Sequence, residues 1–245
     1  MNNFINLEAQ NKPLFFQHKN NHIKLTFPEK GKVRMRKVST RSRARPTGEY
    51  PSWKMSRMME WESHNELNAF VLLDASPSIQ AFAEQPMLIE YSINGVAAKH
   101  YPDIVVAKDG ELQVWEIKPA KEANKEDVRI RTDFLTEYLP RIGYSYHVVT
   151  GEQLSNKLLL DNARTILKFG RDPIHSTSRE ILRVYFLSND SISWLDDIYT
   201  NSDVDVRCVL SRLTLEGILV PESNERIGKG SMFRLKANET KGVSL

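Results

Sequence analysis

The sequence predicts an α/β fold in which a mixed sheet is flanked by helices. Segments with strand character in residues 79–118 are followed by a helical stretch, 121–138, and by another strand, 144–149. Strands and helices that alternate in this way favour a sheet covered by helices. From Ser178 onward the pattern changes to three short helical segments and two strands. The 245 residues are therefore expected to form more than one domain, since domains usually run about 100–150 residues.

Charge is distributed unevenly along the chain, although the net charge is only +3. Residues 1–46 carry eleven basic side chains and two acidic ones, whereas residues 47–170 have a net charge of −5 and residues 171–245 of −1. We therefore divide the chain into a basic N-terminal arm, 1–46, a central domain, 47–170, and a C-terminal domain, 171–245. A basic arm on an acidic body favours a polyanionic partner such as nucleic acid.

The arm has few large apolar residues, so we expect it to form no core of its own. Its basic side chains are the candidate phosphate contacts, and a solvated tail is the alternative interpretation. The candidate DNA-binding residues are Lys32, Arg34, Arg36, Lys37, Arg41, Arg43 and Arg45.

Several classes of protein are excluded by composition. No stretch approaches the ~18 uncharged apolar residues of a membrane span, and the first residues lack the order of a signal peptide. We therefore expect a soluble, cytoplasmic protein with no membrane partner. One cysteine, Cys208, excludes an intramolecular disulfide and a cysteine-rich zinc site. The sequence contains no phosphate-binding glycine loop, so we do not expect an ATPase.

The clearest local signals lie in the central domain. Ser63 and Glu66 have the spacing of a capping box, which predicts that a helix begins at Ser63. Residues 99–106 and 112–119 are predicted as strands joined by a turn at 107–110. We expect these two strands to pair as an antiparallel hairpin.

Two acidic residues and a lysine meet at the open end of this predicted hairpin. Glu116 and Lys118 lie two residues apart in a strand and therefore point to the same side, and counting back from the turn brings Asp103 opposite residues 116–117. Two carboxylates beside an ammonium suit Mg²⁺ or Mn²⁺, because these ions prefer oxygen ligands. A metal ion in that setting can activate water for attack on a phosphodiester. The alternative is a simple salt bridge between Glu116 and Lys118 on an exposed edge.

A third carboxylate is expected from the helix that begins at Ser63. Glu66 lies in the first turn of that helix and is the preferred candidate, with Glu62 as its rival. Glu66 is also the predicted capping partner of Ser63, and the two roles compete for one carboxylate.

The C-terminal residues have the order of a winged helix. Segments 178–187, 192–199 and 203–216 are predicted as helices, and 218–221 and 231–236 as strands around a polar loop. Three helices followed by a β-hairpin are typical of this helix-turn-helix variant. We therefore expect a winged-helix-like α+β domain at this end of the chain.

Four short segments of the central domain form a larger pattern. They are Ser63-His-Asn-Glu66, Phe82-Ala-Glu84-Gln85-Pro86, Tyr101-Pro102-Asp103 and Trp115-Glu116-Ile117-Lys118-Pro119. This pattern resembles the PD-(D/E)xK superfamily of restriction-endonuclease-like nucleases, and within it TnsA, the endonuclease subunit of heteromeric cut-and-paste transposases. The basic arm and the winged-helix-like end extend the resemblance over most of the chain. Some TnsA-like proteins carry glutamine at the position of Glu116, where glutamate restores the common superfamily motif.

The resemblance implies a fold, an activity and partners. It implies a restriction-endonuclease-like mixed sheet, with Glu66, Asp103 and Glu116 as ligands of Mg²⁺ (or Mn²⁺) and Lys118 as the catalytic lysine. It implies that a bacterial, cytoplasmic enzyme cuts the 5′, non-transferred strand of double-stranded DNA at transposon ends. The implied partners are a TnsB-like transposase, which cuts and joins the 3′ ends, and a TnsC-like ATPase regulator.

Two other functions remain open at this stage. One is a non-catalytic winged-helix regulator that binds DNA, although such a protein needs no convergent acids and its third helix, 203–216, should be basic. That segment instead contains Asp203, Asp205 and Glu216 beside two arginines. The other is a nuclease of the same fold that acts in restriction or repair.

Overall fold

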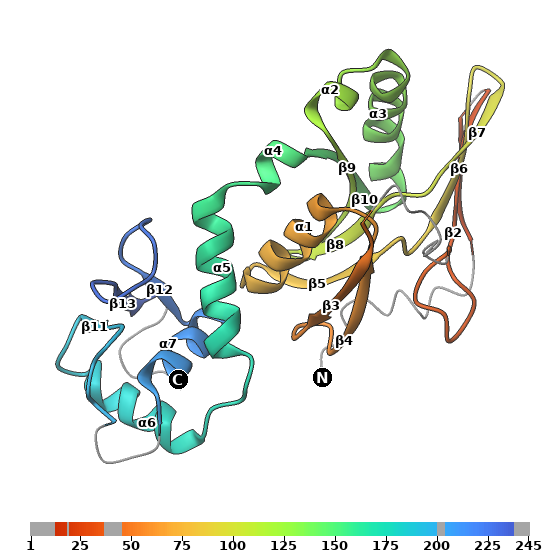
Figure 1. Ribbon diagram of the computed structural model, residues 1–245. Helices are drawn as coiled ribbons and strands as arrows, with labels where there is room; N and C mark the ends of the chain where they lie inside the picture. Colours follow the sequence, from red (N-terminus) through yellow and green to blue (C-terminus); the bar gives the residue numbers. More distant parts are fainter. Residues whose placement is uncertain (1–12, 19, 37–45, 200–203, 238–245) are drawn as a thin grey trace. The chain divides into compact units, whose positions relative to one another are not determined.

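Two four-stranded sheets carry the segments that the sequence singles out (Figure 1). Their strands are β1 (Leu14–His18), β2 (Asn21–Thr26), β5 (Ile79–Glu84), β6 (Leu88–Ile93), β7 (Val96–His100), β8 (Ile104–Lys108), β9 (Glu111–Lys118) and β10 (Tyr144–Thr150). The mixed sheet has the order β10-β9-β8-β5, and β10 runs parallel to β9 while the other neighbours are antiparallel. The second sheet has the order β1-β2-β6-β7 and is antiparallel throughout. The predicted α/β class with a mixed sheet is confirmed.

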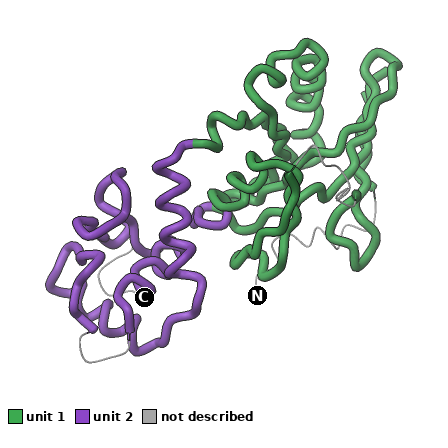
Figure 2. Tube along the Cα trace, viewed as in Figure 1, with its two compact units in different colours: residues 1–73, 79–155 green, residues 74–78, 156–245 purple. Residues whose placement is uncertain are grey.

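The computed structural model describes residues 13–18, 20–36, 46–199 and 204–237. The chain separates into two compact units, shown in different colours in Figure 2. Unit 1 consists of residues 1–73 and 79–155, and unit 2 of residues 74–78 and 156–245. The division at 155/156 lies earlier than the expected one at 170/171, because the intervening helix packs within unit 2.

Helices and a further hairpin complete unit 1. They are α1 (His64–Ala75), α2 (Ala120–Ala123), α3 (Glu126–Tyr138), a 3₁₀ turn (Leu139–Ile142), α4 (Gly151–Leu154), and the paired strands β3 (Gly48–Ser52) and β4 (Arg57–Trp61). Phe134 of α3 shares one apolar cluster with Ile23 of the antiparallel sheet and Val114 of the mixed sheet. On α1, the Phe70 ring lies 5.9 Å from that of Phe82 on β5. Helix α3 therefore joins the two sheets, while α1 packs against the mixed sheet.

The N-terminal arm contributes to a core, which the sequence analysis did not expect. Strand β2 pairs with β6, and Ile23, Leu25 and Phe27 are buried. These apolar residues alternate with polar ones, which is the pattern of a strand with one buried face. These arm residues form no core by themselves but belong to a core completed by residues far away in the sequence, so this part of the arm is not a solvated tail.

The segment predicted as one strand, 99–106, is in fact two strands in different sheets. Strand β7 belongs to the antiparallel sheet and β8 to the mixed sheet, with Tyr101–Asp103 between them. The chain makes the reverse passage between β5 and β6, at Gln85. The backbone N–H of Gln85 donates to the carbonyl of Asp103 over 2.8 Å, so the two crossings lie side by side.

Unit 2 combines helices with a small sheet. Its elements are α5 (Lys157–Gly170), α6 (Ser176–Tyr185), β11 (Ser191–Ser193), α7 (Val206–Leu215), β12 (Leu219–Pro221) and β13 (Met232–Leu235). The sheet has the order β11-β13-β12. The helix predicted at 192–199 is wrong: Ile192 is fully buried opposite Phe233, and its serine neighbours alternate with it as in a strand. None of the helices in the described ranges has both the length and the apolar character needed to cross a membrane.

Close packing of α5 on α7 makes Gly170 sensitive to substitution. In the Gly170→Ala variant, the new Cβ would lie 2.8 Å from the carbonyl carbon of Ser211 and 2.9 Å from the nitrogen of Arg212. Backbone atoms cannot move aside cheaply, so we expect a loss of about 1–3 kcal/mol in the free energy of unfolding, measured by urea titration. Gly230→Ala is the control, since no described atom lies within 4 Å of its Cβ. Equal stability of the two variants would contradict the tight contact.

Candidate active site

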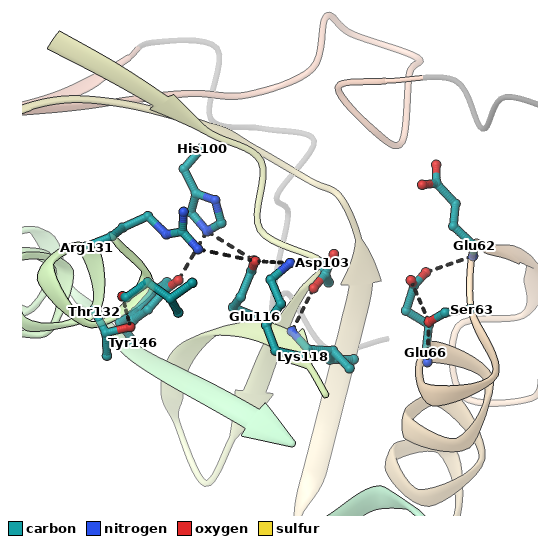
Figure 3. A network of polar contacts seen from close by, with 12 residues as sticks. Glu62, Ser63, Glu66, His100, Asp103, Glu116, Lys118, Arg131, Thr132 and Tyr146 are labelled. Carbon is teal, nitrogen blue, oxygen red and sulfur yellow. Dashed lines mark hydrogen bonds and ion pairs between the residues drawn. The ribbon is translucent and has the colours of Figure 1, made fainter. Parts of the chain in front are cut away.

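A cavity of about 750 Å³ in unit 1 gathers all four residues predicted for catalysis. Its walls come from the first turn of α1, the crossing between β7 and β8, the end of β9, and α3. Glu66, Asp103, Glu116 and Lys118 all line it. Figure 3 shows Asp103, Glu116 and Lys118 together on one side and Glu66 on the facing helix.

Asp103 is held by the hairpin that the sequence predicts. Strand β8 pairs with β9 so that Ile104 lies opposite Trp115. The backbone N–H of Ile117 donates to Asp103 Oδ2 over 2.6 Å. Removal from water, followed by the charges of Glu116 and Glu66, raises the pKa of Asp103 well above its ordinary value. The predicted approach of Asp103 to residues 116–117 is confirmed.

Glu116 is almost fully buried, with 3% of its surface exposed. Lys118 Nζ lies 2.7 Å from Glu116 Oε1, so the two side chains share a face as predicted. Burial lowers the pKa of Lys118, but the hydrogen bond and the charge of Glu116 outweigh it, and the pKa is raised overall. Lys118 is therefore a charged ammonium at neutral pH. The burial of Glu116 argues against a salt bridge on an exposed edge.

Glu66 caps its own helix, as the competing interpretation expects. Its backbone N–H donates to Ser63 Oγ over 3.2 Å, and Ser63 Oγ donates to Glu66 Oε1 over 2.9 Å. The backbone N–H of Glu62 donates to Glu66 Oε2 over 2.9 Å. Burial is the largest cause that raises the pKa of Glu66. The carboxylate is thus fixed at the cavity wall by the cap, opposite Asp103.

Three residues near Glu116 were not predicted as part of the site. His100 Nε2 lies 3.2 Å from Glu116 Oε2, and the Tyr146 hydroxyl lies 3.2 Å from His100 Nε2. Arg131 Nη2 lies 3.6 Å from Glu116 Oε1. Burial, followed by the charges of Arg131 and Lys118, lowers the pKa of His100 to about 3, so its ring is neutral. The sequence does place Arg131 on the apolar face of α3, three residues after the buried Val128. A basic residue on that face is the signal that could have indicated its role in the site.

The donor chemistry of the site fits a hard divalent cation. As they stand, no three His, Cys, Asp or Glu side chains in the described part of the chain are arranged to hold a metal ion. Lys118 forms an ion pair with one oxygen of Glu116, and the Glu66 carboxylate accepts hydrogen bonds in the helix cap. The charges of Glu116 and Glu66 nevertheless disfavour the ionised form of Asp103, and a cation between them would favour it. Glu116 Oε2 is also buried without a hydrogen-bond partner among the described residues. Asp103 and Glu116 are thus the two carboxylates of the cavity wall that could hold such a cation together.

The predicted DNA-binding residues of the arm differ in their surroundings. Arg34 forms an ion pair with Glu60 and its side chain is only 13% exposed. Arg36 is 48% exposed, lines the cavity and pairs with Glu62 at 3.0 Å. Lys32 pairs with the exposed Glu29 at 2.7 Å. The other predicted contacts lie outside the described residues: Lys37, Arg41, Arg43 and Arg45. Of the predicted DNA contacts that the structure describes, Arg36 is the one that lines the cavity.

Comparison with known proteins adds no relative. Neither protein-family models nor curated proteins match this chain. These two comparisons do not identify a TnsA-like family.

The raised pKa of Asp103 predicts how stability depends on pH. Between the ordinary pKa of an aspartic acid and the raised pKa of Asp103, the carboxyl is protonated in the folded protein and ionised in the unfolded chain. The free energy of unfolding of the wild type therefore falls as pH rises through this interval. Asp103→Asn has no such titration, so its free energy of unfolding relative to that of the wild type should rise by about 1.4 kcal/mol per pH unit within the interval. Urea unfolding in chelator at several pH values measures the difference. Asp109→Asn, in the exposed turn of the same hairpin, is the control, and the same trend in both variants would contradict the assignment.

Proposed function

We propose that this chain is a Mg²⁺-dependent DNA endonuclease, the TnsA-like subunit of a heteromeric bacterial transposase in the cytoplasm. In this proposal unit 1 is a restriction-endonuclease-like domain and unit 2 a winged-helix-like domain. The enzyme cleaves the 5′, non-transferred strand at transposon ends. One observation carries the proposal: Asp103, Glu116 and Lys118 converge at the end of the β8–β9 hairpin and face Glu66 across one cavity.

The residues of the cavity suit phosphodiester hydrolysis. Asp103 and Glu116 would hold Mg²⁺ or Mn²⁺, with Glu66 on the facing wall as the third carboxylate. When bound, the metal ion supplies charge stabilisation at the phosphate and lowers the pKa of a water molecule. Lys118 is protonated, so it stabilises negative charge on the phosphate and orients the attacking water rather than accepting a proton. Its position 2.7 Å from Glu116 keeps the ammonium beside the proposed metal site.

The rim of the cavity supports a polyanionic substrate. Besides Lys118, four basic side chains line it: Arg36, Lys99, Lys125 and Arg131. The exposed ring of Tyr101 lies beside Arg36, 5.8 Å from the guanidinium carbon. Basic side chains contact phosphates, and an exposed aromatic ring offers a surface for a base or sugar. The lining also includes Glu62, Glu122 and Asp127, so the basic side chains offer individual phosphate contacts around the proposed metal site instead of a uniformly basic rim.

Unit 2 has a surface suited to a protein partner. A groove of about 420 Å³ on α6 is lined mainly by apolar side chains, among them Ile181, Val184 and Ile198. Val184 and the nearby Leu187 are each 51% exposed. Exposed apolar patches commonly mark protein interaction sites. This supports docking of unit 2 on the TnsB-like transposase or the TnsC-like regulator, which would restrict cleavage to the assembled complex.

The proposed function predicts that Asp103→Asn abolishes cleavage. The amide can still accept the hydrogen bond from Ile117 N, so the hairpin is retained, but it is a weak metal ligand. Loss of a ligand should cost more than the roughly 10–100-fold that substitutions in outer-shell partners cost. The measurement is nicking of a transposon-end duplex, labelled on the 5′ strand, in Mg²⁺ with and without the partner transposase.

Asp109→Asn is again the matched control, since it changes an exposed carboxylate of the same hairpin. It should cleave at the wild-type rate. Cleavage by Asp103→Asn at the wild-type rate would show that the metal site is elsewhere. If the wild-type protein bound the duplex but never cleaved it, with or without partner and Mg²⁺, the non-catalytic regulator would be the better description.

Arg36→Gln should weaken DNA binding evenly across sequences. A phosphate contact releases counterions without reading bases, so its loss should reduce the slope of log affinity against log salt by about 1. Fluorescence anisotropy with labelled duplexes at several salt concentrations measures this slope. Arg129→Gln, an exposed arginine of α3 outside the cavity lining, is the control. An unchanged slope for Arg36→Gln would assign Arg36 to contacts within the protein, with Glu62 and Gln85.

A further inference from the structure

Glu116 belongs to a ring of polar side chains, of which Glu116, His100 and Arg131 line the cavity (Figure 3). His100 Nε2 lies 3.2 Å from one carboxylate oxygen, and Arg131 Nη2 lies 3.6 Å from the other. The Tyr146 hydroxyl lies 3.2 Å from His100 Nε2 and also hydrogen-bonds with Arg131. Tyr146 therefore closes the ring by connecting the two residues that flank Glu116.

The members of the ring come from four separate elements. Glu116 lies on β9, His100 at the end of β7, Arg131 on α3 and Tyr146 on β10. Strand β10 runs parallel to β9 and places Tyr146 opposite Val114, one strand away from Glu116. The chain thus brings polar groups from both sheets and a helix to one carboxylate.

Three of the four ring members are buried, and Arg131 is 20% exposed, so the polarity of the ring is costly. His100 is 7% exposed and Tyr146 is 4% exposed. Buried polar groups destabilise a fold unless they are hydrogen-bonded, yet the ring remains incompletely satisfied. Glu116 Oε2 and Arg131 Nε are both buried without a hydrogen-bond partner among the described residues. Apolar side chains in these positions would stabilise the fold more, so we look for the function of the ring in the cavity.

We propose that His100, Arg131 and Tyr146 are positioning residues that fix the orientation of the Glu116 carboxylate for a divalent cation in the cavity. This inference rests on the proposed function. Arg131 lies beside one oxygen of the carboxylate and His100 beside the other, so the two side chains restrict its rotation. Tyr146 acts only through these two, because its hydroxyl contacts both. Outer-shell partners of this kind typically change metal affinity by about 10–100-fold.

The test is direct binding of Mn²⁺ to the full-length protein, measured by electron paramagnetic resonance in the absence of DNA. Tyr146→Phe removes a single hydroxyl and should weaken Mn²⁺ binding about 10-fold or more. Tyr144→Phe is the matched control, since Tyr144 lies on the same strand, is also buried at 2% exposure, and is not a member of the ring. It should bind Mn²⁺ as wild type does. Thermal unfolding of both variants reports any general loss of stability.

A second pair of variants tests the ring if Tyr146→Phe folds poorly. Arg131→Lys keeps a charged partner for the Glu116 carboxylate, whereas Arg131→Gln does not, so the lysine variant should hold the carboxylate better and retain more Mn²⁺ affinity, although its charge by itself repels the cation. Equal losses in these two, or equal losses in Tyr146→Phe and Tyr144→Phe, would mean that the ring is merely structural.

The outcomes also separate this inference from the proposed function. Wild-type Mn²⁺ affinity in Tyr146→Phe and Arg131→Gln would overturn the positioning role alone and leave the nuclease proposal standing. A wild-type protein that binds no Mn²⁺, and whose binding is not restored by transposon-end duplex, would overturn both.

Discussion

One backbone hydrogen bond ties together the two crossings on which the cavity depends. The chain leaves the mixed sheet at Gln85 and returns to it at Asp103, and the N–H of Gln85 donates to the carbonyl of Asp103. Gln85 adopts a φ of 42°, which is uncommon for a residue other than glycine and is typical of a position held by its surroundings. The carbonyl of Gln85 accepts a hydrogen bond from the backbone N–H of Met35. Both terminal nitrogens of Arg57 donate hydrogen bonds to the carboxylate of the preceding residue, Glu84. The carboxylate of Asp103 therefore projects from a point where both sheets are fixed.

Local signals were sufficient to predict the part of the site that follows from one hairpin and one helix end. The turn between β8 and β9 contains Asp109 and Gly110 at positive φ, as the dipeptide Asp-Gly favours, and it fixes the register that brings Asp103 to Ile117. Alternation in β9 then places Glu116 beside Lys118. The capping pattern of Ser63 and Glu66 likewise predicts the start of α1 within one residue. Each of these inferences needs only a short stretch of sequence.

The rest could not be predicted because it depends on pairing between distant segments. Strand β2 lies opposite β6, so Ile23 meets Tyr91, and no local pattern specifies that partner. The ring around Glu116 draws on β7, α3 and β10, and the histidine, arginine and tyrosine acquire a common role only in the folded chain. The helix predicted for segment 192–199 was wrong for a related reason. The apolar residues of this segment fit both the helical and the strand repeat, and the pairing of Ile192 with Phe233 favours a strand.

The two roles of Glu66 compete less than its sequence position suggests. A cap fixes the carboxylate at the N-terminal end of α1, where the helix dipole favours negative charge. The same end of the helix forms the cavity wall that faces Asp103, so the cap holds the carboxylate at the wall instead of removing it from the site. Its charge already acts there, because it helps to raise the pKa of Asp103. A carboxylate fixed by its own helix costs little further ordering when a ligand binds, which is how a rigid scaffold lowers the entropic cost of binding.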